Sequence, residues 1–220
     1  IKAYLQFIVD NRTGEICGAE VLSRWEHPEL GVMRPGSYIG VMKQPGAITR
    51  HDEAVFERLC ALLEVWKGTP CGKLFLTCNF TRVSISQEDF AERIGEIDGR
   101  YRFDHDRLII EITEDSLIQN GEQAAASIEV CRRMGFRIAI DDMGSGFTAL
   151  SDLYSHEIDL VKIERSVVLN AMTEKGARML KGLRALAHDM GTRVLCEGVE
   201  AAGPRERSRA TGSEMVQGVS

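Results

Sequence analysis

Short apolar runs alternate with stretches of helical periodicity through most of this 220-residue chain. The apolar runs are predicted as β-strands and lie at 74–79, 108–112, 136–141, 158–163 and 193–197. Helices are predicted at 52–66, 120–134 and 172–190. Repeated β–α units with continuously apolar strands form a parallel sheet that is covered on both faces. The pattern therefore predicts an α/β fold.

A polar or charged residue ends almost every one of these strands. In chain order these residues are Asn79, Glu111, Asp141 followed by Asp142, Lys162 and Glu197. If the strands close into a barrel, their carboxyl ends converge at one mouth, which is where barrel enzymes carry their active sites. The strand ends therefore favour a barrel with a site at that mouth over an open sheet.

The chain begins differently, with a predicted β-hairpin. Strands are predicted at 4–9 and 16–25, and the polar segment 10–14 between them is a turn. Glu20 and Arg24 lie four residues apart in the second strand, so they share one face. We expect a TIM-like (β/α)8 barrel, modified by this N-terminal hairpin with one antiparallel strand. Residues 1–220 are expected to form a single domain of a longer multidomain protein.

The charge and cysteine content of the chain restrict which partners and metals it could bind. The formal net charge of −6 argues against binding a nucleic-acid polymer, and an anionic substrate would need a metal ion or a placed Arg or Lys. The six cysteines contain no C-x-x-C pair, so zinc is not expected and the thiols are predicted to be reduced and buried. We see no membrane-spanning run and no signal peptide. A cytoplasmic location follows as the expectation, which includes the cytoplasmic part of a membrane-anchored protein.

Taken singly, each polar strand end has an ordinary explanation. A lone Glu is usually a solvated rim residue, and an Asp-Asp pair is usually a turn or a helix N-cap. Several acidic and amide groups at successive strand ends are less easily dismissed, because a barrel brings them together. Ligands that are all oxygen suit the hard cations Mg²⁺ and Mn²⁺.

Seven segments resemble sequence elements of the EAL domain family, and they occur in the family's order. They are Gly18–Trp25 (the element that names the family, with Val21 in place of Ala), Thr77–Thr81 (V-N-L-S), Glu111–Glu114 (E-x-T-E), Asp141–Phe147 (D-D-F-G-T-G-Y), Val161–Glu164 (L-K-I-D), Glu197–Glu200 (E-G-V-E) and Val216–Gly218 (Q-G). The resemblance extends from end to end of the chain.

The resemblance implies hydrolysis of one phosphodiester bond of cyclic di-GMP, which yields linear pGpG. It implies two divalent ions, Mg²⁺ or Mn²⁺, and inhibition by Ca²⁺. Carried over by position, the metal ligands are Glu20, Asn79, Glu111, Asp141, Asp142 and Glu197, with Asp141 shared by both ions.

Further roles follow from the same resemblance. Lys162 and Glu197 are expected to be catalytic, with Lys162 against the attacking water and the phosphate. The expected substrate-binding residues are Arg24, Leu22, Gln6, Asp52 and Gln217. Glu114 is expected to anchor the loop at 144–147 and so to hold Asp142 in position. Relatives also imply two partners, a second copy in a homodimer and fused sensory or GGDEF domains.

Several positions depart from the family pattern. Gly40 and Lys43 replace a Pro and an acid beside the nucleotide, and Glu164 replaces an Asp near Lys162. Phe7 stands in place of Pro and is interpreted as a packing change. The segment 201–207 is polar and loop-like, and between Gly203 and Thr211 Arg and Ser occupy the family's apolar helix positions. Two alternatives therefore stay open. One is an EAL-type receptor or regulatory interaction module with little or no hydrolysis, and the other is a metal-dependent barrel acting on a different phosphodiester.

Overall fold

The computed structural model describes residues 1–42, 44, 46–113, 121–143, 157–199 and 213–218. Its strands are β1 (Lys2–Asp10), β2 (Ile16–His27), β3 (Gly31–Met33), β4 (Phe75–Asn79), β5 (Leu108–Thr113), β6 (Arg137–Met143), β7 (Leu160–Ile163), β8 (Arg193–Cys196) and β9 (Met215–Gln217). Its α-helices are α1 (Pro35–Tyr38), α2 (Ala47–Trp66), α3 (Arg82–Ile85), α4 (Phe90–Asp98), α6 (Gly121–Arg133), α8 (Arg165–Asn170) and α9 (Glu174–Asp189). Short 3₁₀ turns lie at Ile39–Val41, Pro70–Lys73 and His105–Arg107.

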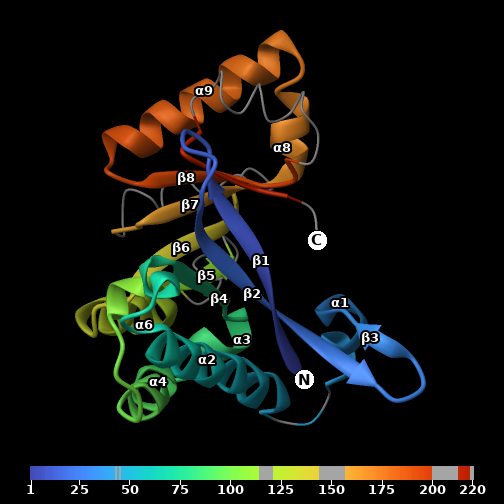
Figure 1. Ribbon diagram of the computed structural model, residues 1–220, viewed down its shortest axis with the longest axis vertical. Helices are drawn as coiled ribbons and strands as arrows, with labels where there is room; N and C mark the ends of the chain where they lie inside the picture. The colour runs from blue at the N-terminus through green and yellow to red at the C-terminus, as the bar shows by residue number, and fades with distance from the viewer. Residues whose placement is uncertain (43, 45, 114–120, 144–156, 200–212, 219–220) are drawn as a thin grey trace.

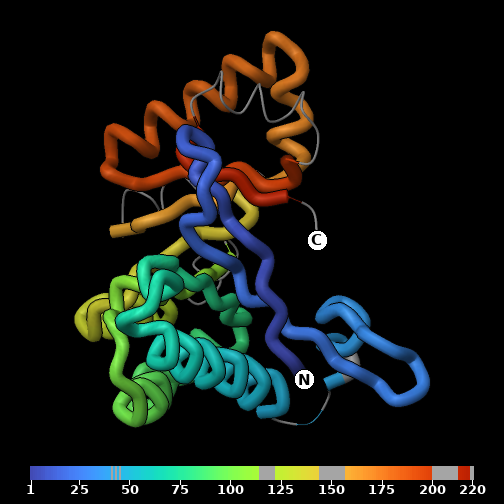
Figure 2. Tube along the Cα trace, in the orientation of Figure 1, coloured from blue at the N-terminus to red at the C-terminus, as the bar shows by residue number. Residues whose placement is uncertain are grey.

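The strands close into a barrel. Their hydrogen-bonded order is β1-β9-β8-β7-β6-β5-β4-β2, and β1 also pairs with β2, which completes the ring. Strand β1 is antiparallel to both of its neighbours, and the other neighbours in the ring are parallel. Figure 2 shows the blue N-terminal hairpin crossing beside the red last strand. The predicted barrel with one antiparallel strand in an N-terminal hairpin is confirmed.

The helices cover the outside of the ring and bury their apolar faces against it. In α2 the buried residues recur three and four positions apart, so they form one stripe. These residues are Val55, Phe56, Leu59, Cys60 and Leu63. Helices α2, α4 and α6 lie beside one another along one part of the barrel, whereas α9 covers β8 (Figure 1). Strand β3 and helix α1 stand together away from the ring.

A layer of apolar side chains fills the barrel interior. It is formed by Ile8, Phe75, Ile109, Ala139, Leu160, Leu195 and Met215, which come from every strand of the ring except β2. Strand β2 contributes Gly18 at this level, because a Cβ atom there would lie 2.6 Å from the ring of Phe75. Successive strand residues alternate between the two faces of a sheet, so the residue two positions further on also points inward.

Most of the sequence-based elements are confirmed, with boundaries that shift by a few residues. Helix α2 begins earlier than predicted, at Ala47. Strands β3 and β9 and helices α4 and α8 were not predicted from periodicity. Among the described residues, no helix is both long and apolar enough to cross a membrane. All six cysteines are free; four are buried, Cys17 is half-buried and Cys71 is exposed, so the expectation of buried thiols holds for most of them.

Candidate metal centre and substrate cavity

Polar side chains occupy the barrel interior directly above the apolar layer. Each lies two residues further toward the mouth than an apolar residue of the same strand, or than Gly18 in β2. They are Glu20 after Gly18, Glu111 after Ile109, Asp141 after Ala139, Lys162 after Leu160, Glu197 after Leu195 and Gln217 after Met215. Strand periodicity thus brings residues from distant parts of the sequence into one ring of inward-facing groups.

Lys162 lies at the centre of this ring and is 1% exposed. Its Nζ atom lies within ion-pair distance of four carboxylates: 2.9 Å from Glu197 Oε1, 3.1 Å from Glu20 Oε2, 3.1 Å from Asp141 Oδ1 and 3.3 Å from Glu111 Oε2. One buried ammonium cannot neutralise four ionised carboxylates. With all four ionised, the cluster carries a surplus of negative charge, which favours protonation of an acid or the binding of further cations.

Glu20 connects the two sides of the cluster. Its Oε1 accepts a hydrogen bond of 2.8 Å from the Asn79 amide, and its Oε2 accepts one of 2.7 Å from the Gln217 amide. Asn79 and Gln217 belong to β4 and β9, on opposite sides of β2 and β1 in the ring. The Gln217 Oε1 atom is buried and has no hydrogen-bond partner among the described residues.

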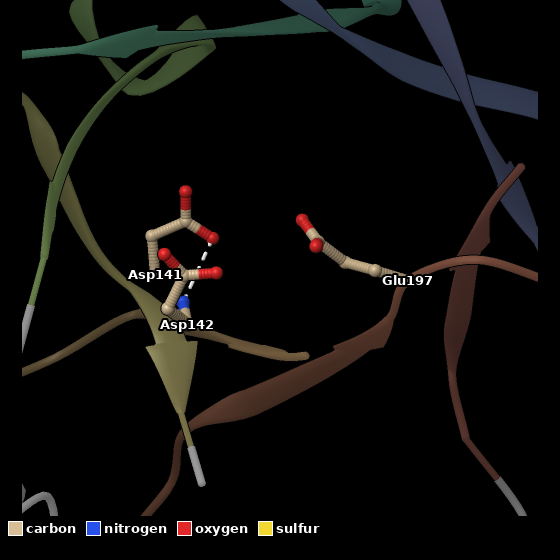
Figure 3. Close-up of side chains that lie close together, drawn as sticks. All are labelled: Asp141, Asp142 and Glu197. Carbon is tan, nitrogen blue, oxygen red and sulfur yellow. Dashed lines mark hydrogen bonds between the residues drawn. The ribbon is translucent and has the colours of Figure 1, made fainter. Parts of the chain in front are cut away.

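Asp141 and Asp142 share the same region because the strand is irregular there. Two consecutive residues of a regular strand point to opposite faces. Asp142 has a φ of 59°, and the pairing of β6 with β7 shifts register between Ile140 and Met143. A bulge of this kind re-aims a side chain, and Asp tolerates the left-handed region better than most residues do. Asp141, Asp142 and Glu197 each place a carboxylate oxygen within 4.8 Å of the others (Figure 3).

The pKa values of the clustered side chains are shifted by burial and by the charges of their neighbours. Burial raises the pKa of Glu111 well above its ordinary value, although Lys162 opposes the shift. Burial raises the pKa of Glu197 to about 7, and burial together with Asp141 raises the pKa of Asp142. Burial alone would lower the pKa of Lys162, but Glu111, Asp141 and the other carboxylates outweigh it and raise that pKa well above its ordinary value. The pKa shifts of the three acids come first from burial and then from neighbouring carboxylates, whereas the pKa of Lys162 rises because of the carboxylates around it.

The donor set fits divalent cations. All of the candidate ligands offer oxygen, and the surplus negative charge calls for further cations. The Glu111 Oε1 atom is buried without a hydrogen-bond partner among the described residues, so one ligand atom is still available. The close approach of Asp141, Asp142 and Glu197 identifies a place where one ion could contact all three. Residues of the chain that could hold ions are therefore Glu20, Asn79, Glu111, Asp141, Asp142 and Glu197.

A cavity of about 310 Å³ opens above the cluster. Both acidic residues and arginines line it. Its lining includes eight predicted site residues: Gln6, Glu20, Leu22, Arg24, Asp141, Lys162, Glu197 and Gln217. It also includes Arg34 and Arg165, which sequence reasoning missed. Arg165 packs over Gly198, the residue after Glu197, where any Cβ atom would collide with its side chain.

Arg24 is held at the wall of this cavity. It is 9% exposed, its Nη1 donates a hydrogen bond of 2.9 Å to the Ser23 carbonyl oxygen, and its guanidinium lies 6.0 Å from the centre of the Tyr4 ring. Gln6 pairs with Glu20 across the hairpin and donates its side-chain amide to the Gly218 carbonyl oxygen. Each of these two side chains thus donates a hydrogen bond to a backbone carbonyl group.

Other predicted residues lie elsewhere. Asp52 is buried in α2 and is not among the described residues lining the cavity. Glu114, the loop at 144–147, Lys43 and the segment 201–207 lie outside the described residues. The interpretation of Phe7 as a packing change is wrong, because its side chain is 50% exposed and lines a second cavity of about 540 Å³ next to the first.

The fold is an eight-stranded α/β barrel with acidic side chains at its strand ends and arginines in the cavity above them. These features define the class as barrel proteins whose acidic centre suits divalent metal ions. The chain belongs to the EAL domain family, which it matches over residues 1–219. Members of this family use divalent metal ions and belong to cyclic di-GMP signalling.

Three relatives illustrate the match. An uncharacterised protein of Mycobacterium tuberculosis is 31% identical over 194 residues, which is 87% of this chain and 31% of that protein. The bifunctional diguanylate cyclase/cyclic di-GMP phosphodiesterase MucR of Pseudomonas aeruginosa is 25% identical over 93% of this chain and 30% of its own length. The structure of the PaMucR phosphodiesterase in complex with c-di-GMP superposes with a TM-score of 0.91 at 24% identity, covering 99% of this chain and 88% of that one. The chain thus spans about a third of the length of these curated relatives.

Proposed function

We propose that this chain is a cyclic di-GMP phosphodiesterase that opens one phosphodiester bond and releases linear pGpG. The observation that carries the proposal is the ring of four carboxylates around Lys162, which lies beneath a cavity with arginines in its wall. Anionic oxygens suit divalent ions, and guanidinium groups suit phosphate. A dinucleotide that carries phosphates and needs metal-assisted hydrolysis matches both parts of the site.

Glu20, Asn79, Glu111, Asp141, Asp142 and Glu197 would hold two ions, Mg²⁺ or Mn²⁺, with Asp141 shared. When bound, such ions lower the pKa of a water molecule and neutralise charge on the scissile phosphate. The chain's own residues do the rest. Arg24, fixed against Ser23, would hold a phosphate oxygen through its planar guanidinium. Gln217 has a buried Oε1 atom without a partner among the described residues and would accept a hydrogen bond from the substrate or from water.

Lys162 would hold a proton at its Nζ atom next to the reacting phosphate. Its contact with Glu197 at 2.9 Å gives that proton an acceptor within the site. Because the lysine is nearly enclosed, its charge is poorly screened and acts strongly on charge that develops during the reaction. Lys162 and Glu197 are therefore the proposed catalytic pair. Leu22 and Gln6 would complete the substrate-facing wall of the cavity.

The remaining assignments extend the same proposal. Glu114 would anchor the loop at 144–147, and Ca²⁺ would occupy the centre without supporting hydrolysis. A homodimer, fused sensory or GGDEF domains in a longer protein, and a cytoplasmic location fit a module of this family.

The decisive experiment incubates the purified domain with cyclic di-GMP and either Mg²⁺ or Mn²⁺ and follows pGpG by chromatography. Binding is measured separately by calorimetry with Ca²⁺. Turnover with either ion is expected. Binding without turnover would instead identify a receptor or regulatory module, and turnover of other phosphodiesters alone would identify a different substrate.

A further inference from the structure

A chain of buried polar side chains runs from β2 to the segment after β4. The Ser23 Oγ atom lies 2.6 Å from the Tyr38 hydroxyl, which lies 3.3 Å from His51 Nε2. His51 Nδ1 lies 3.0 Å from Asp52 Oδ1. All four residues are buried, and they come from β2, α1 and α2. The chain thus joins elements that are distant in the sequence.

The other Asp52 oxygen continues the connection. Asp52 Oδ2 accepts hydrogen bonds from the Thr81 amide at 3.0 Å, the Thr81 hydroxyl at 2.8 Å and the Ser84 hydroxyl at 2.6 Å. Thr81 also caps α3. Both oxygens of this carboxylate are therefore committed to protein groups, which leaves Asp52 little capacity to contact a substrate.

All hydrogen bonds between these four side chains can run in one direction, from Ser23 to Tyr38, His51 and Asp52. With the hydrogen of a neutral His51 on Nδ1, His51 donates to Asp52 and its Nε2 accepts from Tyr38. Tyr38 in turn accepts from Ser23. Burial raises the pKa of Tyr38, so its hydroxyl keeps the proton that it donates. Aligned hydrogen bonds in a buried site strengthen one another, and such networks fix geometry more than they add stability.

The two ends of the chain adjoin two residues of the proposed site. At one end, the Ser23 carbonyl oxygen accepts the hydrogen bond that holds Arg24. At the other end, Thr81 lies two residues after Asn79, which is bonded to Glu20. Tyr38 also belongs to α1, whose first residue, Pro35, lines the cavity together with Arg34. This chain of hydrogen bonds therefore connects the part of the cavity wall that carries Arg24 and Arg34 to the segment next to Asn79.

We propose that Ser23, Tyr38, His51 and Asp52 form a positioning network, which sets the location of Arg24 relative to Asn79 and so governs substrate affinity. This role rests on the proposed function, because Arg24 and Asn79 are its phosphate and metal residues. None of the four is proposed to touch the substrate. Asp52, which the sequence placed near the substrate, acts at a distance through Tyr38 and Thr81.

The test removes one hydroxyl group. Tyr38→Phe keeps the ring, which packs edge-on against Trp25 at 6.0 Å, and deletes only the link between Ser23 and His51. The matched control is Tyr101→Phe. Like the Tyr38 hydroxyl, its hydroxyl donates to a side chain of α2, here the Glu57 carboxylate at 3.2 Å, and Tyr101 is not among the described residues lining the cavity.

We expect Tyr38→Phe to raise KM for cyclic di-GMP, and the Kd measured with Ca²⁺, about fivefold while kcat stays within about twofold. Tyr101→Phe should change neither. In an Arg24→Ala background the effect of Tyr38→Phe should disappear, because the network acts through Arg24. A Tyr38→Phe variant that matches the control, or one whose effect persists in full without Arg24, overturns the network.

Hydrogen exchange separates this inference from the proposed function. Asp52→Asn should speed amide exchange both at residues 22–25 and at 79–84, and this readout needs no substrate. A parent domain that fails to bind cyclic di-GMP but shows this coupling would contradict the proposed function alone. Exchange that changes only next to residue 52 would contradict the network alone.

Discussion

Replacing Lys162 by Met removes the ammonium group that the four central carboxylates share. The ammonium lies 2.9–3.3 Å from all of them, and at an effective dielectric constant of about 20 one such pair is worth about 5 kcal/mol. Most of this is offset by the cost of burying the lysine. Breaking a buried pair from one side nevertheless typically costs about 3–5 kcal/mol. For a domain of 220 residues, this corresponds to a fall in Tm of about 6–20 °C.

The same substitution should affect catalysis through kcat. A group that holds a proton and stabilises developing charge contributes to the transition state, so we expect kcat to fall about 100-fold or more with KM within about threefold. Saturating Mn²⁺ should raise the Tm of the variant more than that of the parent, because added cations replace the lost charge. Thermal melts with and without Mn²⁺ and steady-state kinetics measure both effects. The control is Lys181→Met, at an exposed position of α9.

A metal-free Lys162→Met domain as stable as the parent would refute the reasoning about shared charge. It would mean that the carboxylates hold their positions without the lysine. A collapse of affinity with unchanged kcat would show that Lys162 binds substrate, and its catalytic role would fail.

Four further tests address the metal ligands, the metal ion and the departure at Gly40. Glu20→Ala and Asp141→Ala should each lower turnover at least about tenfold, whereas Glu15→Ala, in an exposed turn, should not; losses below about threefold would contradict the metal assignment. Ca²⁺ should bind and support cyclic di-GMP binding without hydrolysis, and equal turnover with Ca²⁺ and Mg²⁺ in the chromatographic assay would contradict the inferred ion geometry. Gly40→Ala should raise stability by about 0.4–1 kcal/mol, because a Cβ there meets no atom within 4 Å; unchanged melts would argue that Gly40 is not a source of conformational freedom. Gly40→Pro should gain less than Gly40→Ala, since the preceding Ile39 has helical φ and ψ of −59° and −43°, which a following Pro disfavours; equal gains would contradict this argument.

The barrel and the acidic strand ends could be predicted because both follow from periodicity. An apolar run predicts a strand, and the polar residue near its end predicts which end of that strand lies at the barrel mouth. Leu160 and Lys162 in β7 illustrate both parts of this pattern. Strand β9 has only three residues, too few for any periodic pattern, so only its resemblance to a family element marked it. The sequence also shows which residues form the apolar layer and which form the polar ring, because in strands such as β5, β6 and β7 a polar residue follows an apolar one two positions later.

Other features of the site have no local signal. The bulge that turns Asp142 toward Asp141 is a backbone conformation, and the sequence offers only an Asp that tolerates it. Arg34 is the N-cap residue of α1 and Arg165 is the first residue of α8, and no pattern in the sequence predicts that these helix starts line the cavity. The contact between Tyr38 and His51 depends on how α1 packs against α2. Such contacts arise from tertiary packing, which a single sequence without structure does not reveal.

The inverted first strand has a consequence for how the cavity can change shape. In an all-parallel barrel every strand begins at the floor, far from the mouth. Here Lys2 pairs with Arg24 at the mouth end of β2, and β9 reaches the same rim at Gln217. Gln6 in β1 and Gln217 in β9 both line the cavity. A contact made with these two strands at the rim would therefore need no relay through the barrel to alter the shape of the cavity.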